Sequence, residues 1–446
     1  MKNQYLLKTF KDISEKYPDQ KQFLTSVEEV LGSIEPVFER KPELEKSGFL
    51  EKLLEPEHII EFEVEWLDDN GNKQVNKGYR VQFNSLNGPY KGGLRFNKNV
   101  NVGVFKALAF EQTFKNMLTG LPMGGGKGGS DFDPHGKSEA EIERFCHAFM
   151  EKLYPHIGAT YDVPAGDLGV GGREIGYLLD EYLKHKSDIG AITGKPLDKG
   201  GLLGRSEATG YGLCYFVEEL LNDHGDSFKG KRVLVSGSGN VATYANAKAS
   251  EYGAKVIAMS DSKGYIYDEN GIDYKTVLKV KGERQSIEKY LDYVPTAEYH
   301  LNPTDMFKIP CDICLPCATQ NEINLETAKI LVANGCILVG EGANMPSTLD
   351  AIAYYKENNI YFTPAKASNA GGVSCSYFEM LQNATDEKWT FEKTDARLKE
   401  TMVNIYRNIS KTAKEYGKEN DYMLGANIWA FEELYREYLE KNNLPN

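Results

Sequence analysis

The feature that most constrains the fold is a glycine turn between a short β-branched segment and a helical segment. Residues 237–242 read Gly-Ser-Gly-Asn-Val-Ala, which matches the pattern G-x-G-x-x-A. Residues 232–236 have the pattern of a buried strand, and residues 241–252 have that of a helix. A strand, a glycine turn and a helix in this order predict the first βα unit of a parallel sheet that binds a dinucleotide.

The small residues of this turn have separate physical roles. Gly237 permits the tight turn, Gly239 lets the backbone approach a pyrophosphate, and Ala242 lets the helix pack closely on the strand. Free N–H groups at the start of the helix then bind the anion. The alternative is an ordinary βα turn, which the next strand at residues 255–259 disfavours. The contacts expected here are Gly237, Ser238, Gly239, Asn240 and Val241.

The residues after the second strand leave two cofactors open. Asp261 suits a ribose 2′-hydroxyl, which favours NAD. Ser262 and Lys263 follow it, and Lys279 and Lys281 lie further along, so that hydroxyl and ammonium groups could hold a 2′-phosphate. The alternative for these lysines is solvated surface charge. We favour NADP over NAD.

The length and patterning predict an α/β protein of two domains. A chain of 446 residues is too long for one hydrophobic core. Residues 201–425, which alternate strands and helices, are expected to form a Rossmann-like domain. Residues 1–200, with helices, a hairpin and glycine-rich loops, are expected to form a substrate-binding and assembly domain, on which the helix at 426–446 packs back. The active site is expected in a cleft between the two domains.

The composition excludes several classes of protein. A formal net charge of −13 disfavours nucleic acid as a partner. Seven cysteines in a long chain fit a reducing compartment rather than a disulfide framework. No apolar stretch is long enough to span a membrane, and the N-terminus does not resemble a leader. A cytoplasmic protein without a membrane partner is therefore expected.

Three lysines occupy unusual settings in the first half of the chain. Lys91 and Lys127 lie in the glycine-rich segments GPYKGGLRF and PMGGGKGG, and Lys115 lies in EQTFKN. A partly desolvated lysine near other cations has a lowered pKa, which suits proton transfer or nucleophile activation. Asp167, in a Pro/Gly loop, is a candidate partner for acid–base chemistry. The alternative for each lysine is an ordinary exposed side chain.

Two other signals are discounted. Gly128 follows Lys127 where a phosphate loop of an NTPase needs Ser or Thr. Cys311, Cys314 and Cys317 lack the fourth cysteine of a ferredoxin-type cluster and lie in a segment that resembles a buried strand. We therefore expect no metal site.

Eight long segments in order resemble one known family over nearly the whole chain. They are GPYKGGLRF, FEQTFKNMLTGLPMGGGKGGSDFDP, DVPAGDLGVGGREIGYL, ATGYG, SGSGNVA, LPCATQNEI, EGANMP and ASNAGGVSCSYFEMLQN. They resemble the hexameric glutamate dehydrogenases of bacterial type, within the Glu/Leu/Phe/Val dehydrogenase superfamily. The resemblance implies a homohexamer that interconverts L-glutamate with 2-oxoglutarate and ammonium and transfers hydride to NADP. The alternative is an inactive relative that only binds nucleotide.

The resemblance also implies roles for individual residues. Lys127 would activate water, and Asp167 would move protons to and from the substrate nitrogen, near the Gly166 carbonyl. The γ-carboxylate would be held by Lys91 and Ser376, although Ser374 lies close by, and the α-carboxylate by Lys115 and Gln112. Lys91 favours glutamate, because this position is apolar in the relatives that use branched-chain or aromatic amino acids. Further cofactor contacts would be Thr209, Asn240, Ala318, Thr319, Asn344 and Asn369.

Overall fold

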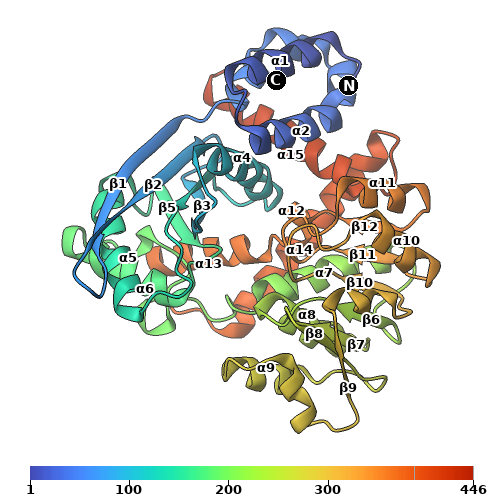
Figure 1. Cartoon of the computed structure of the whole chain (residues 1–446). Helices are drawn as coiled ribbons and strands as arrows, with labels where there is room; N and C mark the ends of the chain where they lie inside the picture. The colour runs from blue at the N-terminus through green and yellow to red at the C-terminus, as the bar shows by residue number, and fades with distance from the viewer. Residues whose placement is uncertain (386, 445–446) are drawn as a thin grey trace. The chain divides into compact units, whose positions relative to one another are not determined.

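A computed structural model describes residues 1–385 and 387–444 of the chain. It separates into two compact units (Figure 1). The first comprises residues 1–203, 373–394 and 427–446, and the second comprises residues 204–372 and 395–426. Residues 373–394 lie inside the span expected for the Rossmann-like domain, yet they belong to the first unit. Buried polar contacts between residues 194–195 and Glu379 hold them there.

The first unit contains a five-stranded mixed sheet in the order β1-β2-β4-β3-β5. Its strands are β1 (His58–Leu67), β2 (Lys73–Asn84), β3 (Tyr90–Phe96), β4 (Gly125–Ser130) and β5 (Asp162–Gly166). Its helices up to residue 203 are α1 (Gln4–Lys16), α2 (Lys21–Arg40), α3 (Phe49–Leu53), α4 (Val102–Leu118), α5 (Glu139–Leu153) and α6 (Gly172–His185), with 3-10 turns at Pro42–Lys46, Tyr154–His156, Ile189–Ala191 and Leu197–Lys199. The C-terminal helices are α13 (Gly371–Thr385), α14 (Phe391–Glu415) and α15 (Tyr422–Lys441). Most of α13 and α15 belongs to the first unit, whereas most of α14 belongs to the second.

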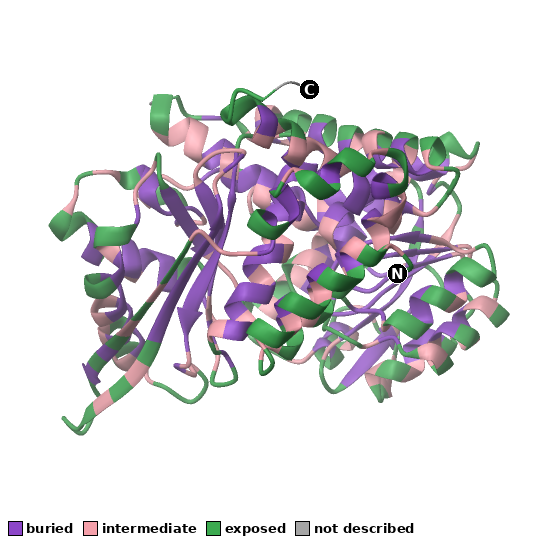
Figure 2. Cartoon of the chain, turned by 90° about the horizontal axis from the view of Figure 1, so that it is seen from above, coloured by how far each residue is buried: buried purple, intermediate pink, exposed green. Residues whose placement is uncertain are grey.

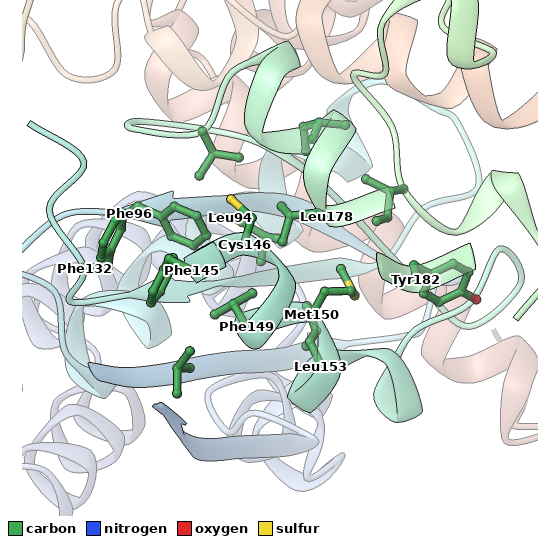
Figure 3. Close-up of a cluster of buried hydrophobic side chains, with 14 of the residues drawn as sticks. Leu94, Phe96, Phe132, Phe145, Cys146, Phe149, Met150, Leu153, Leu178 and Tyr182 are labelled. Atoms are coloured by element: carbon green, nitrogen blue, oxygen red, sulfur yellow. The ribbon is translucent and has the colours of Figure 1, made fainter. Parts of the chain in front are cut away.

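Helices cover both faces of this sheet because strand alternation points apolar side chains to both sides. On one face, Phe83 of β2 contacts Phe110 of α4. On the other, Leu94 and Phe96 of β3 join the aromatic core of α5, where the rings of Phe132 and Phe145 stack with centroids 3.8 Å apart (Figure 3). The sheet face toward α4 also carries the side chains of Lys91 and Lys127.

Three segments expected to be glycine-rich or Pro/Gly-rich loops are strands, so that expectation was wrong. They are β3, β4 and β5. Strand β3 pairs in parallel with both β4 and β5, while β4 also pairs antiparallel with β2. Glycine lacks the side chain that favours strands, but it lets neighbouring backbones come very close. A Cβ at Gly92 would lie 1.7 Å from the Gly126 carbonyl oxygen. The glycines that allow this close packing are thus the same residues that remove the strand signal from the sequence.

The second unit contains a seven-stranded sheet in the order β12-β11-β10-β6-β7-β8-β9. Its strands are β6 (Arg232–Val235), β7 (Lys255–Ser260), β8 (Gly264–Tyr267), β9 (Glu298–Leu301), β10 (Ile313–Leu315), β11 (Leu338–Gly340) and β12 (Tyr361–Thr363). Its helices up to residue 372 are α7 (Ala208–Asp223), α8 (Asn240–Glu251), α9 (Tyr274–Gly282), α10 (Leu325–Ala333), α11 (Leu349–Glu357) and α12 (Ala365–Ser368), with 3-10 turns at Ile287–Asp292 and Pro303–Lys308.

Strands β12, β11, β10, β6 and β7 are parallel, as the strand–helix alternation predicts, whereas β8 and β9 are antiparallel. The turn between β7 and β8 is too short for the crossover that a parallel pair needs. Most strands are buried, except for β1 and β9, and the outer faces of the helices are exposed (Figure 2). In the part of the chain that the structure describes, no helix is both long and apolar enough to cross a membrane.

Candidate active site

Lys127 lies at the centre of the first sheet. Strand β4 is flanked by β2 and β3, and all six of its residues are buried. The Lys127 side chain is 7% exposed, and its Nζ lies 3.0 Å from Oδ1 of Asp167. The backbone therefore holds this ammonium group on a rigid central strand.

Asp167 follows the last residue of β5 and receives two cations. Its Oδ1 pairs with Lys127, and its Oδ2 accepts a hydrogen bond of 2.6 Å from Nε of Arg95. Gly93 of β3 makes this meeting possible, since a Cβ there would lie 2.8 Å from Cβ of Asp167 and 2.7 Å from the Gly166 oxygen. Arg95 was not among the predicted site residues, although it stands in the segment GPYKGGLRF.

Burial and charge shift both titrating groups of the pair. Burial lowers the pKa of Lys127; the Asp167 carboxylate opposes this effect, and the nearby Arg95 guanidinium adds to it. Burial alone would raise the pKa of Asp167, but Lys127 and Arg95 outweigh it and hold that pKa well below its usual range. For Lys127, this direction agrees with the lowered pKa expected from the sequence. Such a lysine can release a proton closer to neutrality while Asp167 stays ionised.

Lys91 is fully buried on β3. Its Nζ donates a hydrogen bond of 2.8 Å to Oγ1 of Thr193, and its carbonyl oxygen accepts one of 3.0 Å from Nδ2 of Asn116. Because alternate residues of a strand share a face, Lys91 and Arg95 point to the same side of β3. The face that carries the Lys127–Asp167 pair therefore carries Lys91 as well.

The remaining predicted substrate residues belong to the same unit. Gln112 of α4 donates a hydrogen bond of 2.7 Å to Asn116, which connects it to the Lys91 backbone. Lys115, three residues further along α4, is partly exposed. Ser376 is buried in α13, and Ser374 is more deeply buried.

The glycine turn of the second unit joins β6 to α8. Gly237 has φ +87°, and its N–H donates a hydrogen bond of 2.9 Å to Oγ of Ser260 at the end of β7. Gly239 caps α8, and a Cβ there would meet open space. The turn thus leaves room at the start of α8, and Asn240, the first residue of that helix, is exposed. These features fit a bound pyrophosphate.

A half-buried carboxylate organises the neighbouring loop, and this role was not expected from the sequence. Glu322 accepts hydrogen bonds of 2.8 Å from Oγ of Ser236 and of 3.2 and 3.3 Å from the N–H groups of Ala318 and Thr319. Burial raises the pKa of Glu322. Since β10 and β6 are adjacent and parallel, this loop and the glycine turn lie side by side at the carboxyl ends of the strands.

Asp261 fixes the turn after β7. Its Oδ1 accepts hydrogen bonds from the N–H groups of Lys263 and Gly264, and its Oδ2 accepts from the Ser286 hydroxyl and the Ile287 N–H. Burial opposes its ionisation, but these donors lower the pKa of Asp261. A carboxylate has about four acceptor positions, so four donors already occupy this one.

The other predicted cofactor residues take several positions in the second unit. Asn369 is buried and donates a hydrogen bond of 2.9 Å to Oδ1 of Asn344, which is exposed beyond β11. Thr209 lies in the first turn of α7. Ser262 and Lys263 are exposed, whereas the Lys281 ammonium is 3.0 Å from the Gln285 carbonyl oxygen.

All seven cysteines are free and buried. Cys314 lies in β10, between Cys311 and Cys317. Burial raises the pKa of the Cys314 and Cys317 thiols. Among residues 1–385 and 387–444, no group of histidine, cysteine or acidic side chains is arranged to hold a metal ion.

A Rossmann-like sheet with an open glycine turn, together with a unit that holds a buried lysine–aspartate pair, is the combination of a dinucleotide-dependent dehydrogenase. Comparison with family models is consistent with this class. Residues 200–441 match the Glutamate/Leucine/Phenylalanine/Valine dehydrogenase model, and residues 56–184 match the dimerisation domain of the same enzymes. The chain belongs to this family.

Relatives of known activity align over nearly the whole chain. The NADP-specific glutamate dehydrogenase of Helicobacter pylori is 50% identical over 96% of this chain and 98% of its own length. The NAD(P)-specific enzyme of Xylanibacter ruminicola is 50% identical over 93% and 94%. The crystal structure of Plasmodium falciparum glutamate dehydrogenase superimposes with a TM-score of 0.95, at 48% identity, over 98% of this chain and 94% of that one.

Proposed function

We propose that this chain is an NADP-dependent glutamate dehydrogenase. It catalyses the reversible oxidative deamination of L-glutamate to 2-oxoglutarate and ammonium. The observation that carries the proposal is the buried Lys127–Asp167 pair on the same sheet face as the buried Lys91. The NADP-specific glutamate dehydrogenases among its relatives support the choice of substrate and cofactor.

The lysines match a substrate with a carboxylate at each end. Lys91 and Ser376 would hold the γ-carboxylate, and Lys115 and Gln112 the α-carboxylate, so that each end meets a cation and a neutral hydrogen-bonding group. The Lys91 ammonium is fully buried, and a charge-assisted hydrogen bond to the γ-carboxylate would be strong in such a site. Fixing both ends would hold the reacting carbon in one place relative to Lys127.

Lys127 and Asp167 would perform the proton transfers. When bound, the nicotinamide accepts the hydride that leaves the substrate Cα. Lys127, with its lowered pKa, would take a proton from the water that attacks the resulting imine. Asp167 would move protons to and from the substrate nitrogen, near the Gly166 carbonyl. Arg95 would favour the ionised form of Asp167, so that this carboxylate gives up each proton it has taken from the substrate nitrogen.

The surroundings of Asp261 favour NADP over NAD. Its four acceptor positions are occupied, which leaves none for a ribose 2′-hydroxyl. The exposed Ser262 and Lys263 beside it offer a hydroxyl and an ammonium to a 2′-phosphate. Lys281 lies at the end of α9 and would add positive charge. The exposed Ala318 and Thr319, with Thr209, Asn344 and Asn369, would complete the cofactor contacts.

The assembly is proposed to be a homohexamer in the cytoplasm. The match of residues 56–184 to a dimerisation domain supports self-association. Measuring the mass of the purified protein in solution would test the number of subunits.

The direct test is an assay with 2-oxoglutarate and ammonium, run separately with NADPH and with NADH. We expect turnover with NADPH and at least about tenfold lower kcat/KM with NADH, which is the ratio that roughly 1.4 kcal/mol of selective binding supplies. Equal use of both cofactors would refute the NADP assignment. Absence of turnover with either, in protein that still binds NADPH, would refute the proposed reaction.

A further inference from the structure

We propose that the buried ion pair between Lys195 and Glu379 positions the subsite for the substrate's side-chain carboxylate and thereby determines selectivity for a dicarboxylic amino acid. This inference rests on the proposed function. Lys195 and Glu379 are separate from the Lys127–Asp167 pair and from the glycine turn.

The pair is completely enclosed. Both side chains have no exposed surface, and Nζ of Lys195 lies 2.8 Å from Oε1 of Glu379. Glu379 also accepts hydrogen bonds from two backbone N–H groups, at 2.9 Å from Gly194 and 3.3 Å from Lys195. One carboxylate thus holds the main chain of residues 194–195 as well as the Lys195 ammonium. The Glu379 carboxylate therefore fixes the backbone of residues 194–195 in addition to neutralising the charge of Lys195.

The residue before this anchored segment contacts Lys91. Oγ1 of Thr193 accepts the hydrogen bond from Nζ of Lys91 at 2.8 Å. The N–H of Thr193 donates to the Pro164 carbonyl oxygen of β5 at 3.0 Å. Thr193 is therefore held on one side by β5 and on the other by the segment that Glu379 anchors. The position of its hydroxyl sets where the Lys91 ammonium points.

The other end of the connection is Ser376. Glu379 and Ser376 are three residues apart in α13, so they lie on the same face of the helix about one turn apart. Ser376 is buried, as Glu379 is. Glu379 therefore ties the helix that carries Ser376 to the segment that orients Lys91. Glu379 would therefore fix the positions of Lys91 and Ser376, the two groups proposed to bind the γ-carboxylate, relative to each other.

The physical chemistry favours positioning over stability as the role of the pair. Burying an ion pair carries a desolvation cost that its attraction often fails to exceed, so apolar residues of similar size are frequently as stable. What apolar residues cannot do is accept the hydrogen bonds from residues 194 and 195. Removing the carboxylate should thus loosen the γ-carboxylate subsite while the α-carboxylate subsite and Lys127 stay intact.

The test is Glu379→Gln, assayed with glutamate and with norvaline, which lacks the γ-carboxylate. We expect KM for glutamate to rise about tenfold, with kcat, and kcat/KM for norvaline, changed by less than about twofold. Equal loss on both substrates, or no change on either, would overturn the proposal. Wild-type protein without glutamate turnover would instead refute the proposed function, so the two failures are distinguishable.

Two further variants complete the design. Asn383 of α13 donates to the Gly200 carbonyl oxygen at 3.3 Å and to the Glu379 carbonyl oxygen at 2.6 Å. It serves as a matched control on the same helix, because its loss leaves the Glu379 carboxylate in place. Asn383→Ala should change glutamate and norvaline efficiency in the same proportion. If Glu379→Gln does not fold, the double variant Lys195→Met/Glu379→Leu removes both charges together. It should show the same selective rise in KM for glutamate, and an unchanged glutamate-to-norvaline ratio would overturn the proposal.

Discussion

Residues 124–129 and residues 237–239 are both rich in glycine, and the molecule uses them in opposite ways. The first segment forms most of β4, a buried central strand. Glycines in and beside it let the neighbouring strands and the Asp167 carboxylate come close to Lys127. The second forms a tight turn in which Gly237 has φ +87° and Gly239 faces open space. One segment presents a fixed cation, and the other presents backbone N–H groups at the start of a helix.

This difference corresponds to two separate tasks of a dehydrogenase, which are to bind the dinucleotide and to select the second substrate. A turn that cradles a pyrophosphate selects a dinucleotide, but it places no constraint on the second substrate. A rigid strand that carries a lysine of lowered pKa among other charges is proposed to select the reaction and the shape of the substrate. Variants of the two segments should therefore fail in different ways.

The largest effect is expected from Lys127→Met. Loss of the proton-transfer group should lower kcat by at least about 10³-fold, because no other lysine pairs with Asp167 in the part of the chain that the structure describes. NADPH affinity, measured by fluorescence titration, should stay close to that of the wild type. Near wild-type turnover would exclude Lys127 from the chemistry.

The next effect is expected from Gly93→Ala. The added methyl group would meet the Gly166 oxygen at 2.7 Å and Cβ of Asp167 at 2.8 Å, so backbone must move. Overpacking of this kind costs about 1–3 kcal/mol, and the displaced Asp167 should lower kcat by about 10²-fold. Thermal unfolding and steady-state kinetics measure the two losses. A variant with unchanged stability and rate would show that this close approach is unimportant.

Gly239→Ala is the matched change in the turn, and a smaller effect is expected. A Cβ there meets nothing, so the unfolding free energy should change by less than about 0.5 kcal/mol. The methyl group would stand where the pyrophosphate approaches, so KM for NADP should rise about tenfold, while KM for glutamate stays constant. A rise in KM for glutamate instead would contradict the separation of roles.

The smallest effect concerns stability and pH. A lysine whose pKa is lowered by folding destabilises the folded state at pH values below that pKa, and the penalty fades as the pH rises. Because burial lowers the pKa of Lys127 although Asp167 lies beside it, Lys127→Met should be more stable than the wild type at pH 7. The gain should shrink toward pH 10. Lower stability of the variant at pH 7 would contradict the burial argument.

The parallel part of the second sheet could be predicted well from the sequence. Apolar runs bounded by turns predict β6, β7 and β10, and the pattern at residues 237–242 predicts the start of α8. Strands β3, β4 and β5 could not be predicted, because strand signals depend on β-branched residues and these strands consist largely of glycine, proline and lysine. Strand β8 was also not predicted, because only a short turn after Asp261 separates it from β7.

The sequence pointed to Lys91, Lys127 and Asp167, but not to the groups that hold these side chains in place. Lys91 and Lys127 stand out because glycine surrounds them. Arg95, Glu322 and Glu379 carry no such local signal, since their roles depend on groups that are distant in sequence. Glu379, for example, lies 185 residues from Gly194, whose N–H it accepts.

The lysine-bearing sheet face is proposed to select the amino acid, whereas the glycine turn is proposed to bind only the cofactor. Lys91→Leu tests this proposal most directly, by the ratio of kcat/KM for glutamate to that for norvaline with NADP. The loss of a buried charge partner for the γ-carboxylate should lower this ratio by about 10²-fold, while Gly239→Ala leaves it unchanged. An equal loss on glutamate and norvaline in Lys91→Leu would contradict the account.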